Sequence, residues 1–382
     1  WRRILEFSLP MLIGNLAQQM YNTADSVIVG IYVGDTALAA VGSASPILNL
    51  LLALFVGIAT GAGILVAQYF GARDRERLSG VIGNCMTLTL VASAIIMVIG
   101  PLVTRPLLEL LNTPASILDW CTDYLNIFFL GIVGFAAYNI LSGVLRGLGD
   151  SLSALVFLIV ATVLNIGLDL WFVAGLRLGV AGVALATVIA QAISAVLCFF
   201  KLFRMHDVFT LRFSHLRPVR EYVGKIIRLG VPSGVTQAIF STAMLVVQSL
   251  TNSFGEAVIA CNVIVMRVDG FAMMPNFTFG QAMTTYTGQN VGAGKPDRVR
   301  TGAKQGTLMA LACAAALTLC ILLFGRSLMG IFTDTAELVE MSYHMMCILA
   351  VGYIAMAVTQ SLSGVMRGAG DTMTPMWISI IT

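Results

Sequence analysis

Four ionisable residues lie inside long apolar stretches of this 382-residue sequence: Asp25, Asp169, Arg267 and Asp269. A charge in such a setting is costly and defaults to a functional hypothesis. Asp25 and Asp169 each fall about six or seven residues before the end of an apolar stretch, which places them about 10 Å below the same surface if the stretches are helices. We therefore expect these two carboxyl groups to converge.

The neighbours of these carboxyls suit the binding of a proton or a cation. Tyr21 lies four residues before Asp25, and Asn165 lies four residues before Asp169, so each pair shares a helix face. Two carboxylates in a low-dielectric pocket resist double ionisation unless a proton or a cation compensates them. Carboxylate, amide and hydroxyl oxygens fit a hard cation such as sodium. The alternative is two separate carboxyls, each satisfied by its own hydrogen bonds.

The other two ionisable residues need partners elsewhere. Arg267 and Asp269 are two positions apart and do not face each other on a helix. Each is either part of a structural polar network or takes part in substrate binding or ion coupling. Nearby, Phe271, Met273 and Met274 could form an adaptable surface for apolar ligands, although ordinary helix packing explains them too.

The elements that must position these residues are membrane helices. The sequence is 58% hydrophobic and 11% charged, with a mean hydropathy of +0.90, whereas an average soluble domain is about one quarter charged. This composition argues against a water-soluble enzyme. Pro10 predicts a kink in the first helix. The apolar stretches predict an all-α polytopic membrane protein with helices at 4–32, 36–70, 80–103, 118–147, 152–175, 179–203, 222–253, 257–291, 301–325 and 338–367, and an eleventh that starts near 373.

The distribution of basic residues predicts the orientation. With the N-terminus in the cytoplasm, 18 of the 22 Lys and Arg residues fall on the cytoplasmic side and three fall outside. The basic stretch 201–228 fits retention on that side better than nucleic-acid binding. Seven scattered cysteines show neither a disulfide framework nor a metal-ligand spacing, and we expect no cofactor beyond a coupling ion.

An internal repeat divides the chain in two. Residues 141–151 (LSGVLRGLGDS) recur as residues 362–372 (LSGVMRGAGDT), and residues 68–72 (QYFGA) match residues 289–293 (QNVGA) at the same offset of 221. Six predicted helices separate the copies, so both halves have the same orientation, an arrangement known from transporters. The arginines and aspartates of the first motif, at helix ends, are expected to serve in capping and loop packing.

The repeat predicts an N-lobe at 1–205, a cytoplasmic linker at 206–221 and a C-lobe at 222–382. By comparison with the first half, the second half lacks most of an eleventh helix and all of a twelfth, so we expect the chain to be truncated within helix 11 of a twelve-helix protein.

These motifs together resemble those of the multidrug and toxic compound extrusion (MATE) transporters. The further pieces that carry the resemblance are residues 22–30 (NTADSVIVG), 37–42 (ALAAVG), 165–169 (NIGLD) and 182–187 (GVALAT). The resemblance covers essentially the whole chain. It implies a V-shaped pair of six-helix lobes in a bacterial inner (plasma) membrane. It also implies secondary antiport, in which an amphipathic, often cationic compound leaves as Na⁺ or H⁺ enters.

The resemblance also assigns residues. Asp25 matches the aspartate of helix 1 that binds the proton or sodium ion in family members with a functional N-lobe cavity. Its partners there match Asn165, Asp169 and Thr187. Tyr21, Tyr124 and Asn139 match residues on the same cavity, and Pro10 matches the proline at which helix 1 of the family bends.

One departure from the family pattern separates its branches. The NorM-like branch carries an acidic residue inside helix 7, but residues 232–250 contain no Asp or Glu, so a DinF-like branch fits better. Asp269 is a possible substitute acid in the C-lobe. The alternative functions are a lipid-linked precursor flippase, which the superfamily also contains, and a membrane-embedded enzyme. Only Arg267 is clearly buried in a span, which argues against a polyphosphate headgroup, and no DDxxD or HExxH motif supports an enzyme.

Overall fold

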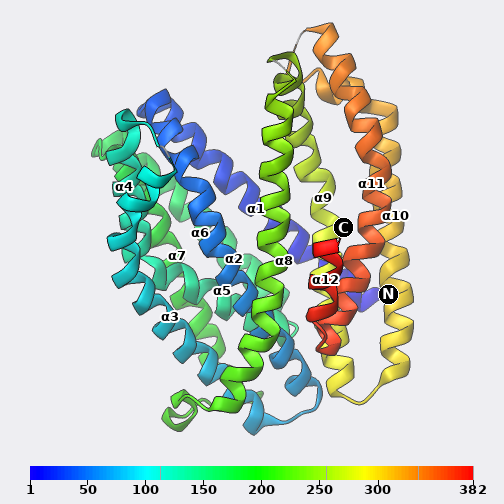
Figure 1. The fold of residues 1–382 in the computed structure, drawn as a ribbon. Helices are drawn as coiled ribbons and strands as arrows, with labels where there is room; N and C mark the ends of the chain where they lie inside the picture. Colours follow the sequence, from blue (N-terminus) through cyan, green and yellow to red (C-terminus); the bar gives the residue numbers. More distant parts are fainter. Residues whose placement is uncertain (112, 255, 334, 382) are drawn as a thin grey trace.

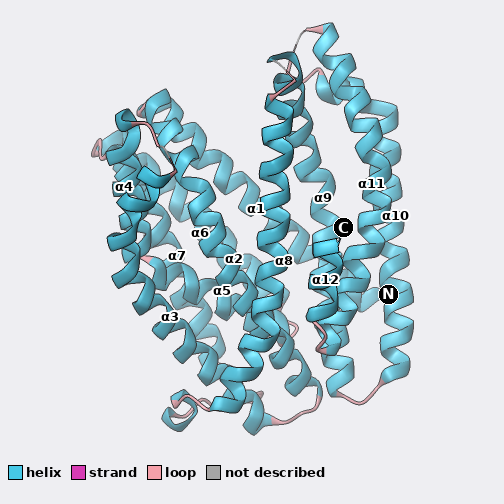
Figure 2. Ribbon diagram, in the orientation of Figure 1, coloured by secondary structure: helices cyan, strands magenta, loops and turns pink. Residues whose placement is uncertain are grey.

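The computed structural model describes residues 1–111, 113–254, 256–333 and 335–381, and within these ranges it contains helices and loops but no strand (Figure 2). The first half holds α1 (Arg2–Tyr32), α2 (Asp35–Gly71), α3 (Arg75–Leu110), α4 (Ala115–Leu130), α5 (Ile132–Gly147), α6 (Ser151–Asp169), the π-helical turn η1 (Leu170–Gly175) and α7 (Gly179–Phe203). The second half holds the 3₁₀ turn η2 (Phe213–Leu216), α8 (Arg220–Asn252), α9 (Glu256–Gly292), α10 (Pro296–Met329), α11 (Ala336–Ala369) and α12 (Met373–Ile381).

The helices form two bundles arranged as a V, with α1–α7 in one lobe and α8–α12 in the other (Figure 1). The lobes meet at the end that carries the linker and diverge toward the opposite end. At the meeting point α2 packs on α8 and α9. A Cβ atom on Gly57 of α2 would lie 2.6 Å from the carbonyl oxygen of Gly230 on α8, so glycine is what allows these two backbones to touch.

The prediction of one continuous helix at 118–147 is wrong. The stretch 118–147 was expected to form a single helix, but α4 and α5 are separated at Gly131 and bent by 54°. A side chain at Gly131 would collide with Val188 of α7, so the break coincides with a close approach between helices. The remaining helices begin and end within about five to seven residues of the predicted bounds, and α7 matches them at both ends.

Seven helices of the described residues are long and apolar enough to cross a membrane, or eight if the bent pair α4–α5 forms one span. The structure therefore supports a polytopic membrane protein. Helix α1 is 31 residues long and falls outside this set. Asparagines, glutamines and Asp25 interrupt its apolar residues. Polar side chains such as these need hydrogen-bond partners inside the helix bundle.

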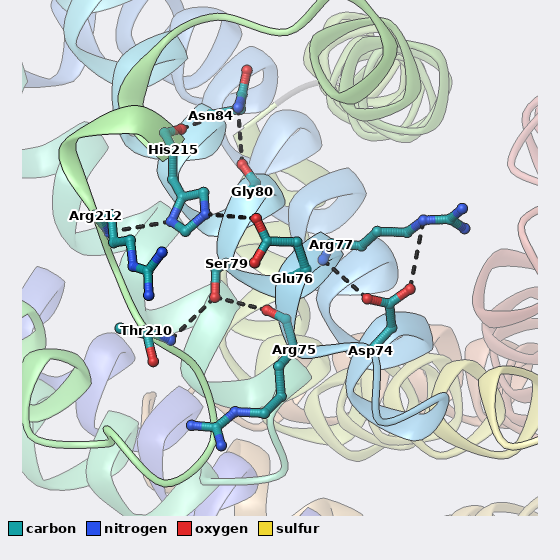
Figure 3. Close-up of polar contacts among 10 residues, drawn as sticks. All are labelled: Asp74, Arg75, Glu76, Arg77, Ser79, Gly80, Asn84, Thr210, Arg212 and His215. Atoms are coloured by element: carbon teal, nitrogen blue, oxygen red, sulfur yellow. Dashed lines mark hydrogen bonds and ion pairs between the residues drawn. The ribbon is translucent and has the colours of Figure 1, made fainter.

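The linker between the lobes is docked on α3 rather than extended into solvent (Figure 3). Asn84 donates to the carbonyl oxygen of His215 at 3.2 Å and accepts from the backbone N–H of Val219 at 2.7 Å. The His215 ring also lies 3.3 Å from the Glu76 carboxylate. The linker is thus a strap fixed to the first lobe just before α8 begins.

Candidate functional site

A buried polar cluster joins three helices of the first lobe. Asp25 comes from α1, Asn165 and Asp169 come from α6, and Thr187 comes from α7. With its amide oriented to satisfy hydrogen bonding, Asn165 donates from Nδ2 to Asp25 Oδ1 at 2.7 Å and to Asp169 Oδ2 at 3.2 Å. The other atom of that amide lies 3.4 Å from the hydroxyl of Thr187. One amide therefore bridges the two carboxyl groups that the sequence singled out.

Most of the cluster is shielded from solvent, and Asp25 is half-buried. Asn165 and Asp169 are 0% exposed, and Thr187 is 6% exposed. The Asp25 and Asp169 carboxyls are within hydrogen-bonding reach of each other. Two oxygens so placed repel when both groups are charged, so the pair must share a proton or bind a cation.

Local helix geometry explains why these side chains meet. Tyr21 and Asp25 are one turn apart on α1, as Asn165 and Asp169 are on α6, and α1 packs along α6. Helix α6 ends at Asp169 and continues as the π-helical turn η1. Such turns are rare and concentrate at functional sites. The hydropathy of the sequence does not predict this π-helical turn.

The two tyrosines predicted to line the cavity lie beside the cluster. Tyr21 is 5% exposed and Tyr124 is 7% exposed, and both are close enough to Asp25 to interact with it electrostatically. Asn139 lies elsewhere. It donates to the carbonyl of Phe135 on its own helix at 2.9 Å and lines the cavity between the lobes, described below.

The donor set of the cluster fits a sodium ion. Asp25, Asp169, Asn165 and Thr187 offer carboxylate, amide and hydroxyl oxygens, which hard cations prefer. Asp169 Oδ1 is buried and has no hydrogen-bond partner among the described residues, so it is free to act as a ligand. The described part of the chain, this cluster included, contains no group of three or more His, Cys, Asp or Glu residues placed to hold a metal ion, so the amide and hydroxyl oxygens would have to complete the ligand set.

The ionisable residues of α9 have different surroundings. Arg267 is exposed and lines an open groove together with the polar face of α1, including Gln19 and Asn22. Asp269 accepts a hydrogen bond from the hydroxyl of Tyr353 on α11 at 2.7 Å. The two side chains thus have separate partners.

The predicted substrate surface on α9 does not face the cavity between the lobes. Phe271 is exposed, and Met273 packs on the apolar core formed by α9, α10 and α11. Met274 is half-buried, and none of these three residues lines that cavity. Phe277 of the same helix does line it.

The cavity between the lobes has a volume of about 370 Å³ and is lined by α1, α2 and α5 of one lobe and by α8, α9, α11 and α12 of the other. Arg146 and Arg367, the arginines of the repeated motif, both line it. The expectation that these arginines serve in capping and loop packing is wrong in this respect. The expectation that only Arg267 is clearly buried in a span is wrong as well, because Arg267 is exposed whereas Arg146 and Arg367 are half-buried. Their motif partners are the caps: Asp150 accepts from the backbone N–H of Ser153 in the first turn of α6, and Asp371 accepts from that of Thr374 in the first turn of α12.

Two symmetric hydrogen bonds lie next to this cavity. Gln68 of α2 donates to the carbonyl oxygen of Gly368 at 3.0 Å, and Gln289 of α9 donates to that of Gly147 at 3.0 Å. Each bond crosses from one lobe to the other and joins one repeated motif to the other. We call this pair of bonds the glutamine clasp. The spacing of the repeats in the sequence was its only signal.

Helix α1 connects the cluster to the opposite lobe. Asn15 of α1 donates to the hydroxyl of Thr278 on α9 at 2.9 Å. The C-terminal half of α1, which contains Asp25, runs into the first lobe (Figure 1). The helix runs without interruption through Pro10.

The sequence profile of the MatE family matches residues 10–171 and again 232–382, one match in each lobe. The chain belongs to the MatE family. The probable multidrug resistance protein YoeA of Bacillus subtilis is 30% identical over all of this chain and 84% of its own length. The probable multidrug resistance protein NorM of Thermotoga maritima is 26% identical over all of this chain and 82% of its own.

A solved structure described as the outward-facing conformation of a multidrug resistance MATE family transporter superimposes with a TM-score of 0.93. It shares 26% sequence identity, and the match covers 99% of this chain and 84% of the other. The fold is therefore that of a MATE transporter, and the family supports multidrug export. Because the relatives are named as transporters, the family points away from an enzyme.

Proposed function

We propose that this MATE protein exports amphipathic compounds, cationic ones among them, in exchange for protons or sodium ions by alternating access. The observation that carries the proposal is the amide bridge of Asn165 between Asp25 and Asp169. A buried pair of carboxyls held this closely changes its interactions whenever a proton or a cation arrives or leaves. We place the protein in a bacterial inner membrane with its N-terminus in the cytoplasm, as the basic residues indicate.

Contacts of helix α1 with both lobes support a route from the proposed ion site to the second lobe. Asp25 of α1 lies beside Asn165 of α6, whereas Asn15 of the same helix donates to Thr278 of α9 in the second lobe. A proton or sodium ion at the cluster removes the repulsion between the carboxyls and tightens the contact of α1 with α6. The opposite end of the same helix then transmits the change to the second lobe, and a ligand that favours one of two arrangements shifts the population toward it.

Asp25 and Asp169 hold the coupling ion in this proposal, Asn165 and Thr187 orient it, and Tyr21 and Tyr124 keep water from the site. If sodium is the coupling ion, it supplies positive charge that compensates the carboxylates. The splayed ends of the lobes face outside when the linker is cytoplasmic. The arrangement in Figure 1 then corresponds to a state in which the outer side is open and the cytoplasmic side is closed.

The test is transport of a fluorescent organic cation into inside-out vesicles, driven separately by a proton gradient and by a sodium gradient. We expect one gradient to drive uptake by the wild type and Asp25→Asn to reduce that uptake at least about tenfold, since the neutral amide cannot bind the coupling ion by charge. Asp119→Asn is the matched control, because its side chain is 78% exposed at the surface. Unchanged coupled uptake by Asp25→Asn would contradict the assignment.

A further inference from the structure

The charge inside the cavity between the lobes has one sign. Among the described residues that line it, Arg146 and Arg367 are the charged ones, and no Asp or Glu is present. A volume of about 370 Å³ is within the range of small-molecule sites, which begins at about 300 Å³. The cavity is thus large enough for a ligand and electropositive.

Neither arginine is neutralised by the protein. Arg146 donates to the hydroxyl of Ser142 at 3.3 Å, and the ion pairs of the described residues include neither Arg146 nor Arg367. The nearest acids in sequence are engaged elsewhere: Asp150 bonds the hydroxyl of Ser153 at 2.7 Å, and Asp371 caps α12. Guanidinium groups inside a membrane protein without a carboxylate are costly, and an anion in the cavity offsets this cost.

The two arginines occupy equivalent positions of the repeat on opposite lobes. Arg146 lies near the end of α5 and Arg367 near the end of α11, each directly before a glycine that accepts a bond of the glutamine clasp. An anion that contacts both would bridge the lobes. The planar guanidinium matches carboxylate and phosphate oxygens in a bidentate manner.

The rest of the lining fits an apolar body attached to that anion. Phe240 of α8 and Phe277 of α9 meet edge to face, with their ring centroids 5.6 Å apart, and both line the cavity. Gln281 and Gln360 add neutral hydrogen-bonding groups. A ligand with an anionic group and an aromatic or aliphatic body could contact both the arginines and the phenylalanines that line the cavity.

We propose that Arg146 and Arg367 form an anion subsite that binds the carboxylate or phosphate group of an amphipathic substrate in the cavity between the lobes. The inference rests on the proposed export function and specifies one chemical group, a carboxylate or phosphate, that substrates of this cavity carry. On this proposal the substrates include zwitterionic and anionic amphiphiles. The anionic group that the subsite recognises can come from a phospholipid headgroup or from a free drug that carries a carboxylate.

The test compares two dyes that differ at one group. Rhodamine 110 carries a free carboxylate, and rhodamine 123 is its methyl ester. Binding to the purified protein in phosphatidylcholine nanodiscs is followed by fluorescence polarisation. We expect Arg146→Gln and Arg367→Gln each to weaken rhodamine 110 binding about tenfold or more, which corresponds to about 1.4 kcal/mol, and to change rhodamine 123 binding less than about twofold. Arg→Lys variants should retain part of the affinity.

Arg105→Gln, at an exposed position of α3, is the matched control and should alter neither affinity. Equal weakening of both dyes by the cavity variants, with a lowered Tm, would make the arginines structural and overturn the proposal. Unchanged rhodamine 110 binding would overturn it as well.

A second arm identifies the source of the anion. Phosphatidylglycerol in the nanodiscs should compete with rhodamine 110 in the wild type, and only while both arginines are present, if the natural ligand is a lipid headgroup. Absence of competition together with arginine-dependent dye binding supports a free anionic amphiphile. The assay uses no ion gradient. Rhodamine 110 binding that does not depend on the arginines, found together with intact coupled export of organic cations, would therefore overturn this inference and leave the proposed function standing.

Discussion

The glutamine clasp should determine how tightly the two lobes close on the side of the molecule that we place in the cytoplasm. Gln68 and Gln289 each donate to a backbone carbonyl of the opposite lobe at 3.0 Å. A net contribution of about 0.5–1.5 kcal/mol per hydrogen bond gives about 1–3 kcal/mol for the pair. We therefore expect the double variant Gln68→Ala/Gln289→Ala to raise the ratio of cytoplasm-open to cytoplasm-closed molecules by about 5- to 150-fold.

Double electron–electron resonance, which measures the distance between two spin labels, would detect this shift. Arg204 at the end of α7 and Lys304 on α10 are exposed and belong to different lobes, so cysteines at these positions report the opening. The seven free cysteines of the chain must first be replaced. The expected result is a second, longer distance population in the double variant.

The matched control for the clasp is Asn290→Ala. Asn290 is adjacent to Gln289, but its amide donates to the carbonyl of Tyr286 on its own helix at 2.8 Å, so its loss removes no contact between the lobes. This variant should keep the wild-type distances. If the double variant also keeps them, the two bonds do not hold the lobes together and the reasoning fails.

Two glycine substitutions test related contacts. Gly292→Ala places a Cβ atom against the backbone carbonyl of Gln68. Overpacking of this kind should destabilise the closed arrangement by about 1–3 kcal/mol relative to the open one. The same spin labels should then show longer distances. A wild-type distance distribution would argue against this contact. Gly83→Ala places a Cβ atom against the carbonyl of His215 in the docked linker. It should release the strap, seen as faster trypsin cleavage after the linker arginines, and an unchanged cleavage rate would show that docking tolerates the methyl group.

Much of the architecture could be predicted because it is encoded locally. Mean hydropathy over about 20 residues locates a membrane helix without reference to its neighbours, and α7 was located at 179–203 on that basis. The break at Gly131 escaped prediction because a single glycine inside an apolar stretch is tolerated in a continuous helix. The break follows contact with Val188 of α7, which is distant in sequence.

The site divides in the same way. The sequence by itself determined which carboxyls lie at equal depth and on matching helix faces, because rise and periodicity are fixed properties of a helix. Only the tertiary structure decided that Asn165 bridges Asp25 and Asp169, and that Arg146 and Arg367 line one cavity rather than cap their own helices. The physical reason is that a repeat shows two positions to be equivalent, but whether they meet depends on how the lobes pack across their shared axis.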